Sequence, residues 1–159
     1  MRNKKQEQNH NSLWMALAGG LAGACALTLV HETVRRLNPD APRMDVLGMR
    51  ALAKTIRAAG HEPPAEDKLF GWTMLGDIVS NALYYSLTGT GKGVWLKGPA
   101  LGLAAGVGGV MLPGPLGLGE GPSNRTTQTK VMTVAWYLLG GIAAAAATHC
   151  LTSLADRKE

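Results

Sequence analysis

No charged side chain occurs between Leu13 and Val30, and this bare stretch constrains the fold more than any other feature of the sequence. A helix of that length nearly spans the hydrocarbon core of a bilayer, which needs about 20 apolar residues. Three further apolar stretches follow, each bounded by charges or by glycine and proline. The pattern predicts an all-α fold, a four-helix transmembrane bundle whose crossings lie at about residues 13–32, 69–87, 94–112 and 130–151.

Two other interpretations of the first stretch compete with a retained helix. A cleaved signal peptide has a shorter apolar region, which ends at small residues and precedes a polar mature chain. The segment "AGAC" ending at Cys25 is also faintly similar to a lipoprotein cleavage site, although Ala22 stands where a larger apolar residue is preferred. Because the apolar run continues beyond Cys25, we favour a retained helix over either alternative.

Charged residues gather near the ends of the chain and in one long internal segment. We therefore expect a disordered basic tail at residues 1–11, a single membrane domain at residues 12–154 and a charged tail at residues 155–159. A polar insert at residues 33–68 separates the first two crossings. Lys and Arg are divided almost evenly between the two sides of this topology, so the positive-inside rule selects no orientation.

The polar insert contains one amphipathic segment, residues 44–59. At about 100° per residue, Arg50, Lys54 and Arg57 fall on one helix face, and apolar residues occupy the opposite face. A basic helix with an apolar back can lie on the membrane surface, where anionic lipid headgroups would be its partners. In the alternative interpretation the apolar face caps the end of the bundle, and the two interpretations are compatible.

Glycine is abundant in this chain, with 21 residues. Lipid removes most of the hydrophobic drive between helices, so small residues four apart must let helix backbones approach each other. The predicted packing glycines are Gly19, Gly23, Gly98, Gly102, Gly106 and Gly141. Their recurrence in three predicted helices is typical of a membrane bundle, and it allows a homo-oligomer or a place in a larger membrane complex.

The second predicted crossing carries a polar stripe around Asp77. An ionised carboxylate at membrane depth costs about 3 kcal/mol, so Asp77 needs a proton or hydrogen-bond partners. Asn81 lies one turn later on the same face and can donate a hydrogen bond to the carboxylate. The predicted polar intramembrane site comprises Asp77, Asn81, Thr73, Ser80, Tyr84 and His149, with His31 and Lys97 as further candidates for a cationic partner.

The polar stripe has two interpretations. It can form a proton-responsive site or the wall of a path for a small solute. It can instead form an interhelical hydrogen-bond cluster that sets the register of the bundle. We favour the register interpretation, because a single acid without a second buried charge makes a poor proton relay.

The composition and the motifs exclude several classes of function. The 16 Lys and Arg residues exceed the 11 Asp and Glu residues, but no basic cluster is interleaved with aromatic residues, so nucleic acid is not an expected partner. The sequence has no H-E-x-x-H, G-x-S-x-G or phosphate-loop motif, so we expect no catalytic residues, no metal site and no cofactor. We expect a non-enzymatic membrane scaffold or accessory subunit; the alternative is a proton- or solute-responsive transporter or channel.

Two segments carry a resemblance to a known family. They are the first predicted helix with its exit "HETVRRLNPDAPRMD", which ends at residue 45, and "GPALGLAAGVGGVMLPGPLGLG" at residues 98–119. In the placement of glycine and proline they resemble the YagU-like inner-membrane proteins of bacteria, small multi-pass proteins of uncharacterised role. The resemblance covers about a third of the chain and includes no catalytic signature. It implies a bacterial cytoplasmic membrane as the location.

Overall fold

The computed structural model describes residues 2–157, with side chains from residue 11 onward, and this part of the chain forms helices without any strand. The predicted all-α class is therefore confirmed. Residue 1 of the predicted basic tail and residues 158–159 of the predicted charged tail lie outside the described residues. The helices are α1 (Arg2–Val34), α2 (Met44–Ala58), α3 (Glu66–Ser86), α4 (Val94–Met111), α5 (Gly121–Asn124) and α6 (Thr127–Asp156).

The first helix is longer than its predicted crossing. Residues 2–11, where the sequence predicts a disordered tail, continue α1 in the structure. Three helical segments are long and apolar enough to cross a membrane: residues 11–34 of α1, α4 and α6. α3 occupies the range of the remaining predicted crossing but does not meet that measure of length and composition. The sequence and the fold therefore agree on a chain suited to a membrane.

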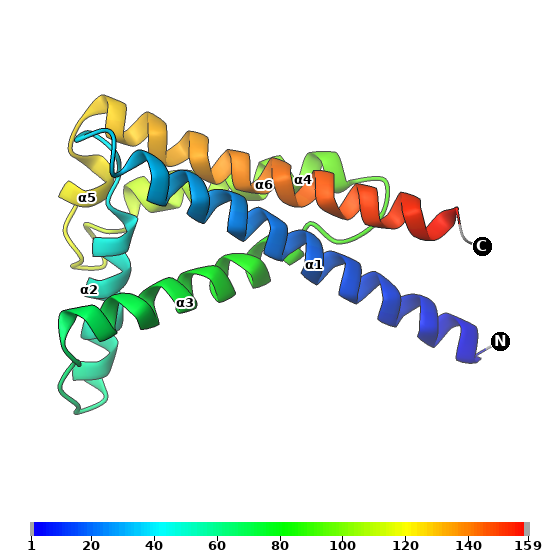
Figure 1. The fold of residues 1–159 in the computed structure, drawn as a ribbon, viewed down its shortest axis with the longest axis horizontal. Coiled ribbons are helices and arrows are strands. Elements are labelled where there is room, and N and C mark those ends of the chain that lie inside the picture. The colour runs from blue at the N-terminus through cyan, green and yellow to red at the C-terminus, as the bar shows by residue number, and fades with distance from the viewer. Residues whose placement is uncertain (1, 158–159) are drawn as a thin grey trace.

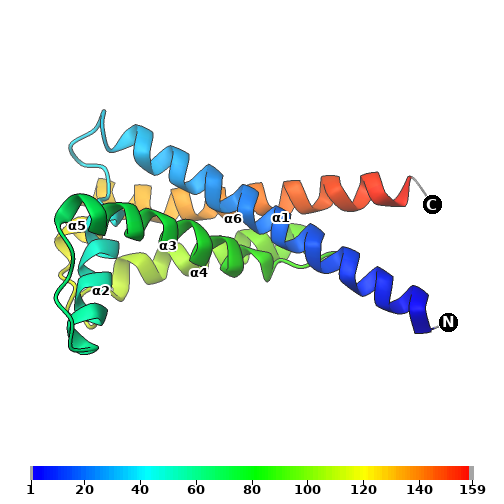
Figure 2. The same ribbon diagram turned by 60° about the horizontal axis from the view of Figure 1, so that its bottom comes forward.

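α6 is the central helix of the molecule, because α1 and α4 both pack along it. α3 packs against α1 and diverges from α6, and it contacts α4 only sparsely (Figure 1). α2 and α5 lie at one end of the molecule, and both chain ends lie at the other (Figures 1 and 2). In both views α2 runs across the direction of α4 and α6.

Glycines allow α4 and α6 to touch through their backbones. A Cβ added at Gly102 would lie 2.5 Å from the carbonyl oxygen of Tyr137 and 2.8 Å from Cα of Leu138, closer than real Cβ atoms approach. The other predicted packing glycines are also buried at tight contacts: Gly98, Gly106 and Gly141 between α4 and α6, and Gly19 and Gly23 between α1 and α6. The buried core at these contacts consists of Leu27, Tyr85, Tyr137 and Ala144.

The end of the molecule around α2 is held by hydrogen bonds to backbone carbonyls and by one contact between a cation and an aromatic ring. The amide of Arg43 donates to the carbonyl of Pro122 at 2.8 Å, and Oγ1 of Thr129 donates to the carbonyl of Asp40 at 2.9 Å. The guanidinium group of Arg35 lies 5.7 Å from the centre of the Phe70 ring, which connects the end of α1 to the start of α3. Leu47 and Ala53 of α2 are buried, so its apolar face caps the bundle.

Candidate functional site

The polar stripe of α3 faces the interior of the molecule. Thr73 and Asn81 are only 7% and 9% exposed, and Asp77 is half-buried between them. Nδ2 of Asn81 donates to Oδ1 of Asp77 at 3.0 Å and also to the Asp77 carbonyl at 3.0 Å. Ser80 is exposed, and its hydroxyl donates back to the Asp77 carbonyl at 3.1 Å. The expected geometry between Asp77 and Asn81 is therefore present.

The opposite face of α3 is apolar and exposed. Trp72, Leu75, Val79 and Leu83 follow at helical spacing and are 64%, 54%, 49% and 56% exposed. In water, such a stripe would be turned inward and the polar stripe outward. α3 has the reverse arrangement, and its buried polar residues lower its average hydropathy. This arrangement explains why α3 is less apolar on average than the membrane-compatible segments of α1, α4 and α6.

A small enclosed cavity connects the polar stripe to the first helix. It has a volume of about 20 Å³, and its walls include Thr28 and His31 of α1 and Thr73 and Asp77 of α3. Among the described residues, Oγ1 of Thr28, Nε2 of His31 and Oγ1 of Thr73 are buried without a hydrogen-bond partner. The volume matches the space that one water molecule needs. The cavity thus places an imidazole and a carboxyl on the same small polar space.

His31 is fixed in this position by aromatic rings of α6. Its ring centre lies 4.8 Å from that of Trp136 and 5.8 Å from that of Tyr137, both in edge-on geometry. His149, which the sequence analysis placed in the polar site, is exposed and lies 5.7 Å from the ring of Trp95. It lines a different hollow, near the chain ends, together with Asn11. The structure therefore brings His31 to Asp77 and leaves His149 apart.

An ion-pair cluster closes the cavity on the side of α2. Glu32 accepts two hydrogen bonds from Arg35, at 2.7 and 2.6 Å. Asp45 accepts a 2.7 Å hydrogen bond from Arg43 and lies 3.6 Å from Arg35. Burial raises the pKa of Asp45, but the hydrogen bond and the charge of Arg43, with the charge of Arg35, outweigh burial and hold that pKa below its usual range.

The cationic partners in this cluster are stabilised in their charged form. The hydrogen bond to Glu32 raises the pKa of Arg35, and the hydrogen bond to Asp45 raises the pKa of Arg43. Arg35, Arg43 and Asp45 are therefore all charged near neutral pH. The cluster ties the end of α1 to the start of α2 next to the polar stripe.

The polar stripe also borders a wider groove between α3, α4 and α2. The groove has a volume of about 620 Å³. Asp77, Asn81 and Tyr84 lie on its α3 wall, and the Tyr84 hydroxyl donates to the carbonyl of Leu101 on α4 at 3.0 Å. The α4 wall consists of small residues, namely Ala104, Ala105, Gly108 and Gly109. Asp77 therefore borders both the enclosed cavity and the groove.

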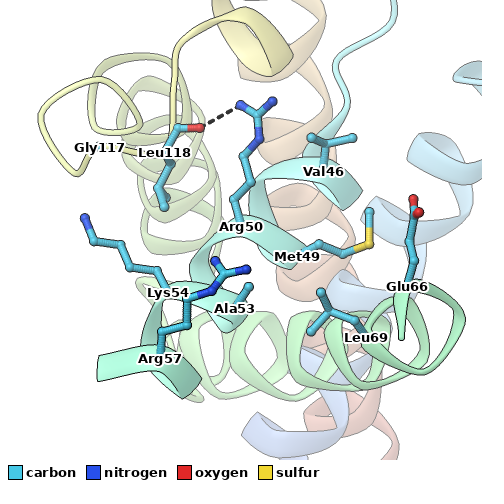
Figure 3. Close-up of a pocket in the computed structure, with 10 residues that line it drawn as sticks. All are labelled: Val46, Met49, Arg50, Ala53, Lys54, Arg57, Glu66, Leu69, Gly117 and Leu118. Carbon is cyan, nitrogen blue, oxygen red and sulfur yellow. Dashed lines mark hydrogen bonds between the residues drawn. The ribbon is translucent and has the colours of Figure 1, made fainter. Parts of the chain in front are cut away.

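The basic face of α2 lines a separate groove, on the side of α2 that meets the 112–119 loop (Figure 3). Arg50, Lys54 and Arg57 extend into it from α2, with Glu66 on the far side. Arg50 donates to the carbonyl of Leu118 at 2.7 Å. The sequence predicted the clustering of these cations, but not the loop that lies against them.

Where side chains are described, at residues 11–157, no group of three or more His, Cys, Asp or Glu side chains is arranged to hold a metal ion. Cys25 and Cys150 are both exposed, although their apolar surroundings in the sequence suggest burial. Comparison with protein-family models, with curated proteins and with solved structures finds no match to this chain. Function must therefore be inferred from the geometry and chemistry of the chain itself.

Proposed function

We propose that this protein is a multi-pass integral membrane protein with four crossings, formed by α1, α3, α4 and α6, and that it acts as a non-enzymatic scaffold or accessory subunit. α2 lies on the membrane surface between the first two crossings. The chain ends share one side of the membrane with the 87–93 turn, while α2 and α5 lie on the other side. The resemblance to YagU-like proteins adds the proposal that the membrane is a bacterial cytoplasmic membrane.

The orientation of α3 about its own axis carries this proposal. Its exposed stripe, from Trp72 to Leu83, is apolar, and its polar residues Thr73 and Asn81 are buried. Exposed apolar stripes of this length favour lipid as the surrounding medium. The crosswise direction of α2 at the end of the bundle supports its place on the membrane surface, because such a helix is parallel to the bilayer when α4 and α6 cross it (Figure 1).

The groove between α3 and α4 supports the scaffold role. Ala104 and Gly108, and likewise Ala105 and Gly109, are small residues spaced four apart on its α4 wall. This spacing lets two membrane helices pack with their backbones in close contact, and it is typical of pairs of identical helices. The occupant that we propose is α4 of a second copy of this chain, so that the protein assembles as a dimer through this groove.

Disulfide cross-linking in a bilayer tests this assembly. In a Cys25→Ala, Cys150→Ala background, Ala104→Cys is expected to form a covalent dimer on oxidation, because the two α4 helices approach each other there. Leu103→Cys is the matched control, because Leu103 is exposed on α4 outside the groove. Equal cross-linking at both positions, or none at position 104 in a folded protein, would contradict the proposal.

A second candidate function rests on the position of Asp77. Its carboxyl borders both the enclosed cavity with His31 and the open groove, so it can contact a proton or a small solute from either side. A proton- or solute-responsive transporter would use such a group. If Asp77→Asn abolishes a proton- or solute-dependent flux in proteoliposomes while the fold is kept, this function replaces the scaffold role. If the wild-type protein shows no flux, the transporter function is excluded.

A further inference from the structure

The basic groove on α2 has the size and lining of a ligand site. Its volume is about 530 Å³, within the range of about 300–1,000 Å³ that small-molecule sites occupy. Three cationic side chains of α2 and one carboxylate, Glu66, line it. Figure 3 shows Arg50 extending from α2 toward Leu118, Lys54 toward Gly117, and Arg57 with its guanidinium group beside Ala53. The groove therefore carries an excess of positive charge.

Hydrogen bonds hold Arg50 and Lys54 in place, and both side chains keep further N–H donors for a ligand. Arg50 donates to the carbonyl of Leu118 at 2.7 Å, and Lys54 donates to the carbonyl of Leu116 at 2.6 Å. A guanidinium group has five N–H donors and an ammonium group has three, so each retains donors for a ligand. Among residues 11–157, no ion pair joins Arg57 to a carboxylate. An anion is thus the ligand that these groups favour.

The remaining walls of the groove are apolar. They are formed by Val46, Met49, Ala53, Leu69 and Leu118. Such a lining favours an amphiphile over a small soluble anion, because an amphiphile has an apolar part that can cover the apolar wall of the groove. Leu69 lies near the start of α3, and the exposed Trp72 follows within one turn, at the level where tryptophan marks a membrane interface.

We propose that this groove binds an anionic phospholipid, with its phosphate and headgroup on Arg50, Lys54 and Arg57 and an acyl chain along the apolar wall. This inference rests on the proposed membrane position of α2. The charge of the groove selects anionic over zwitterionic lipid. Glu66 faces the headgroup from α3, and its negative charge disfavours a ligand with more than one phosphate.

The experiment measures the affinity of the full chain, in neutral detergent, for a fluorescent phosphatidylglycerol and for a phosphatidylcholine with the same acyl chains. We expect the wild-type protein to prefer phosphatidylglycerol, and this preference should weaken as salt concentration rises. The triple change Arg50→Gln, Lys54→Gln and Arg57→Gln should weaken phosphatidylglycerol binding on the order of one hundredfold. Binding of phosphatidylcholine should change little.

A matched triple controls for charge alone. Arg36→Gln, Lys68→Gln and Lys130→Gln removes the same charge from exposed positions outside the groove, and it should leave the preference for phosphatidylglycerol close to wild type. Arg57→Gln alone tests the site without disturbing the bonds to the 112–119 loop. It should weaken binding about fivefold while the thermal midpoint stays the same.

The proposal would be overturned if both triple variants lost the same affinity for phosphatidylglycerol, or if a folded Arg57→Gln variant bound it with wild-type affinity. Displacement of phosphatidylglycerol by millimolar glycerol phosphate would also overturn it, because the site would then be one for a soluble anion. A negative result for lipid binding can be told apart from a wrong topology. The topology is tested separately, by finding on which side of the membrane Glu62 and Lys92 lie.

Discussion

At the scale of single residues, Asp77 has one neighbour that could be predicted from the sequence and one that only the fold brings close. Asn81 could be predicted as its partner, because the two residues are one helical turn apart. His31 could not be singled out, because only the packing of α1 against α3 brings it to the same cavity. His149 carries an equally plausible imidazole in the sequence, yet the length of α6 places it near the chain ends.

Gly102 offers a direct test of backbone contact between α4 and α6. Gly102→Ala should destabilise the protein by about 1–3 kcal/mol, because the added Cβ meets the backbone of Tyr137 and Leu138, which cannot rotate away. The measurement is unfolding in detergent, followed by helical circular dichroism. Gly76→Ala is the control, since nothing lies within 4 Å of a Cβ at Gly76. An equal response of the two variants would contradict the close contact.

The lowered pKa of Asp45 leads to a prediction of how the stability of the protein depends on pH. Its folded-state pKa lies below its ordinary value, so its stabilisation is fully present above about pH 4 and is lost as the pH falls through the folded-state pKa. The thermal midpoint of the wild type should therefore fall in this acid range. Asp45→Asn should lower the midpoint at pH 7 and flatten the acid fall, because it removes the carboxylate on which Arg43 and Arg35 converge.

The control for this acid dependence is Asp67→Asn. Asp67 is an exposed acid in the first turn of α3 and has no ion pair among the described residues. Its loss should leave both the midpoint at pH 7 and the acid fall almost unchanged. If Asp45→Asn behaves in the same way, the ion-pair cluster contributes nothing to stability.

At the scale of the elements, most helix bounds could be predicted because charges, glycine and proline mark them in the sequence. The crossing predicted at residues 94–112 is α4, Val94–Met111, and the amphipathic segment predicted at residues 44–59 is α2, Met44–Ala58. The position of α5 and of the 112–119 loop could not be predicted. The hydrogen bonds of Arg50 and Lys54 to that loop join residues far apart in the chain.

α3 shows how an average over a helix can hide its membrane character. Thr73 and Asn81 are buried, whereas Trp72, Leu75 and Leu83 form an apolar stripe that is open to the surrounding lipid. A hydropathy average counts both faces equally, although only the outer face faces the surrounding medium. Composition, and not length, therefore distinguishes α3 from α1, α4 and α6.

Val79 tests the lipid-facing stripe of α3. Val79→Lys places a charge on the exposed face near the middle of the helix, at a cost of about 2.5–3.5 kcal/mol, and should lower the equilibrium constant for crossing by α3 by about two orders of magnitude. Asp67→Lys, at the exposed start of α3, should leave crossing unchanged. The readout is the side of the membrane on which a cysteine at position 92 is labelled. Unchanged labelling in Val79→Lys would show that this face does not meet lipid.

At the scale of the whole molecule, the two ends are separated by the apolar faces of the long helices. α2 and α5 lie at one end, and the chain ends lie at the other (Figure 2). The ion-pair cluster of Glu32, Arg35 and Asp45 belongs to the α2 end, because Asp45 lies in the first turn of α2. Between the two ends lie the apolar faces of the long helices, with many large apolar side chains exposed. This division follows from the charge segregation in the sequence and fits a bilayer between the two ends.

The sidedness of three cysteines decides whether α3 crosses the membrane. In a Cys25→Ala, Cys150→Ala background, single cysteines replace Glu62, Lys92 and Asp156, all exposed, and a membrane-impermeant maleimide labels intact spheroplasts of a bacterial expression host. Four crossings predict that positions 92 and 156 share one side and that position 62 lies on the other. Placement of all three on one side would show that only α1, α4 and α6 cross, and would contradict the four-helix bundle.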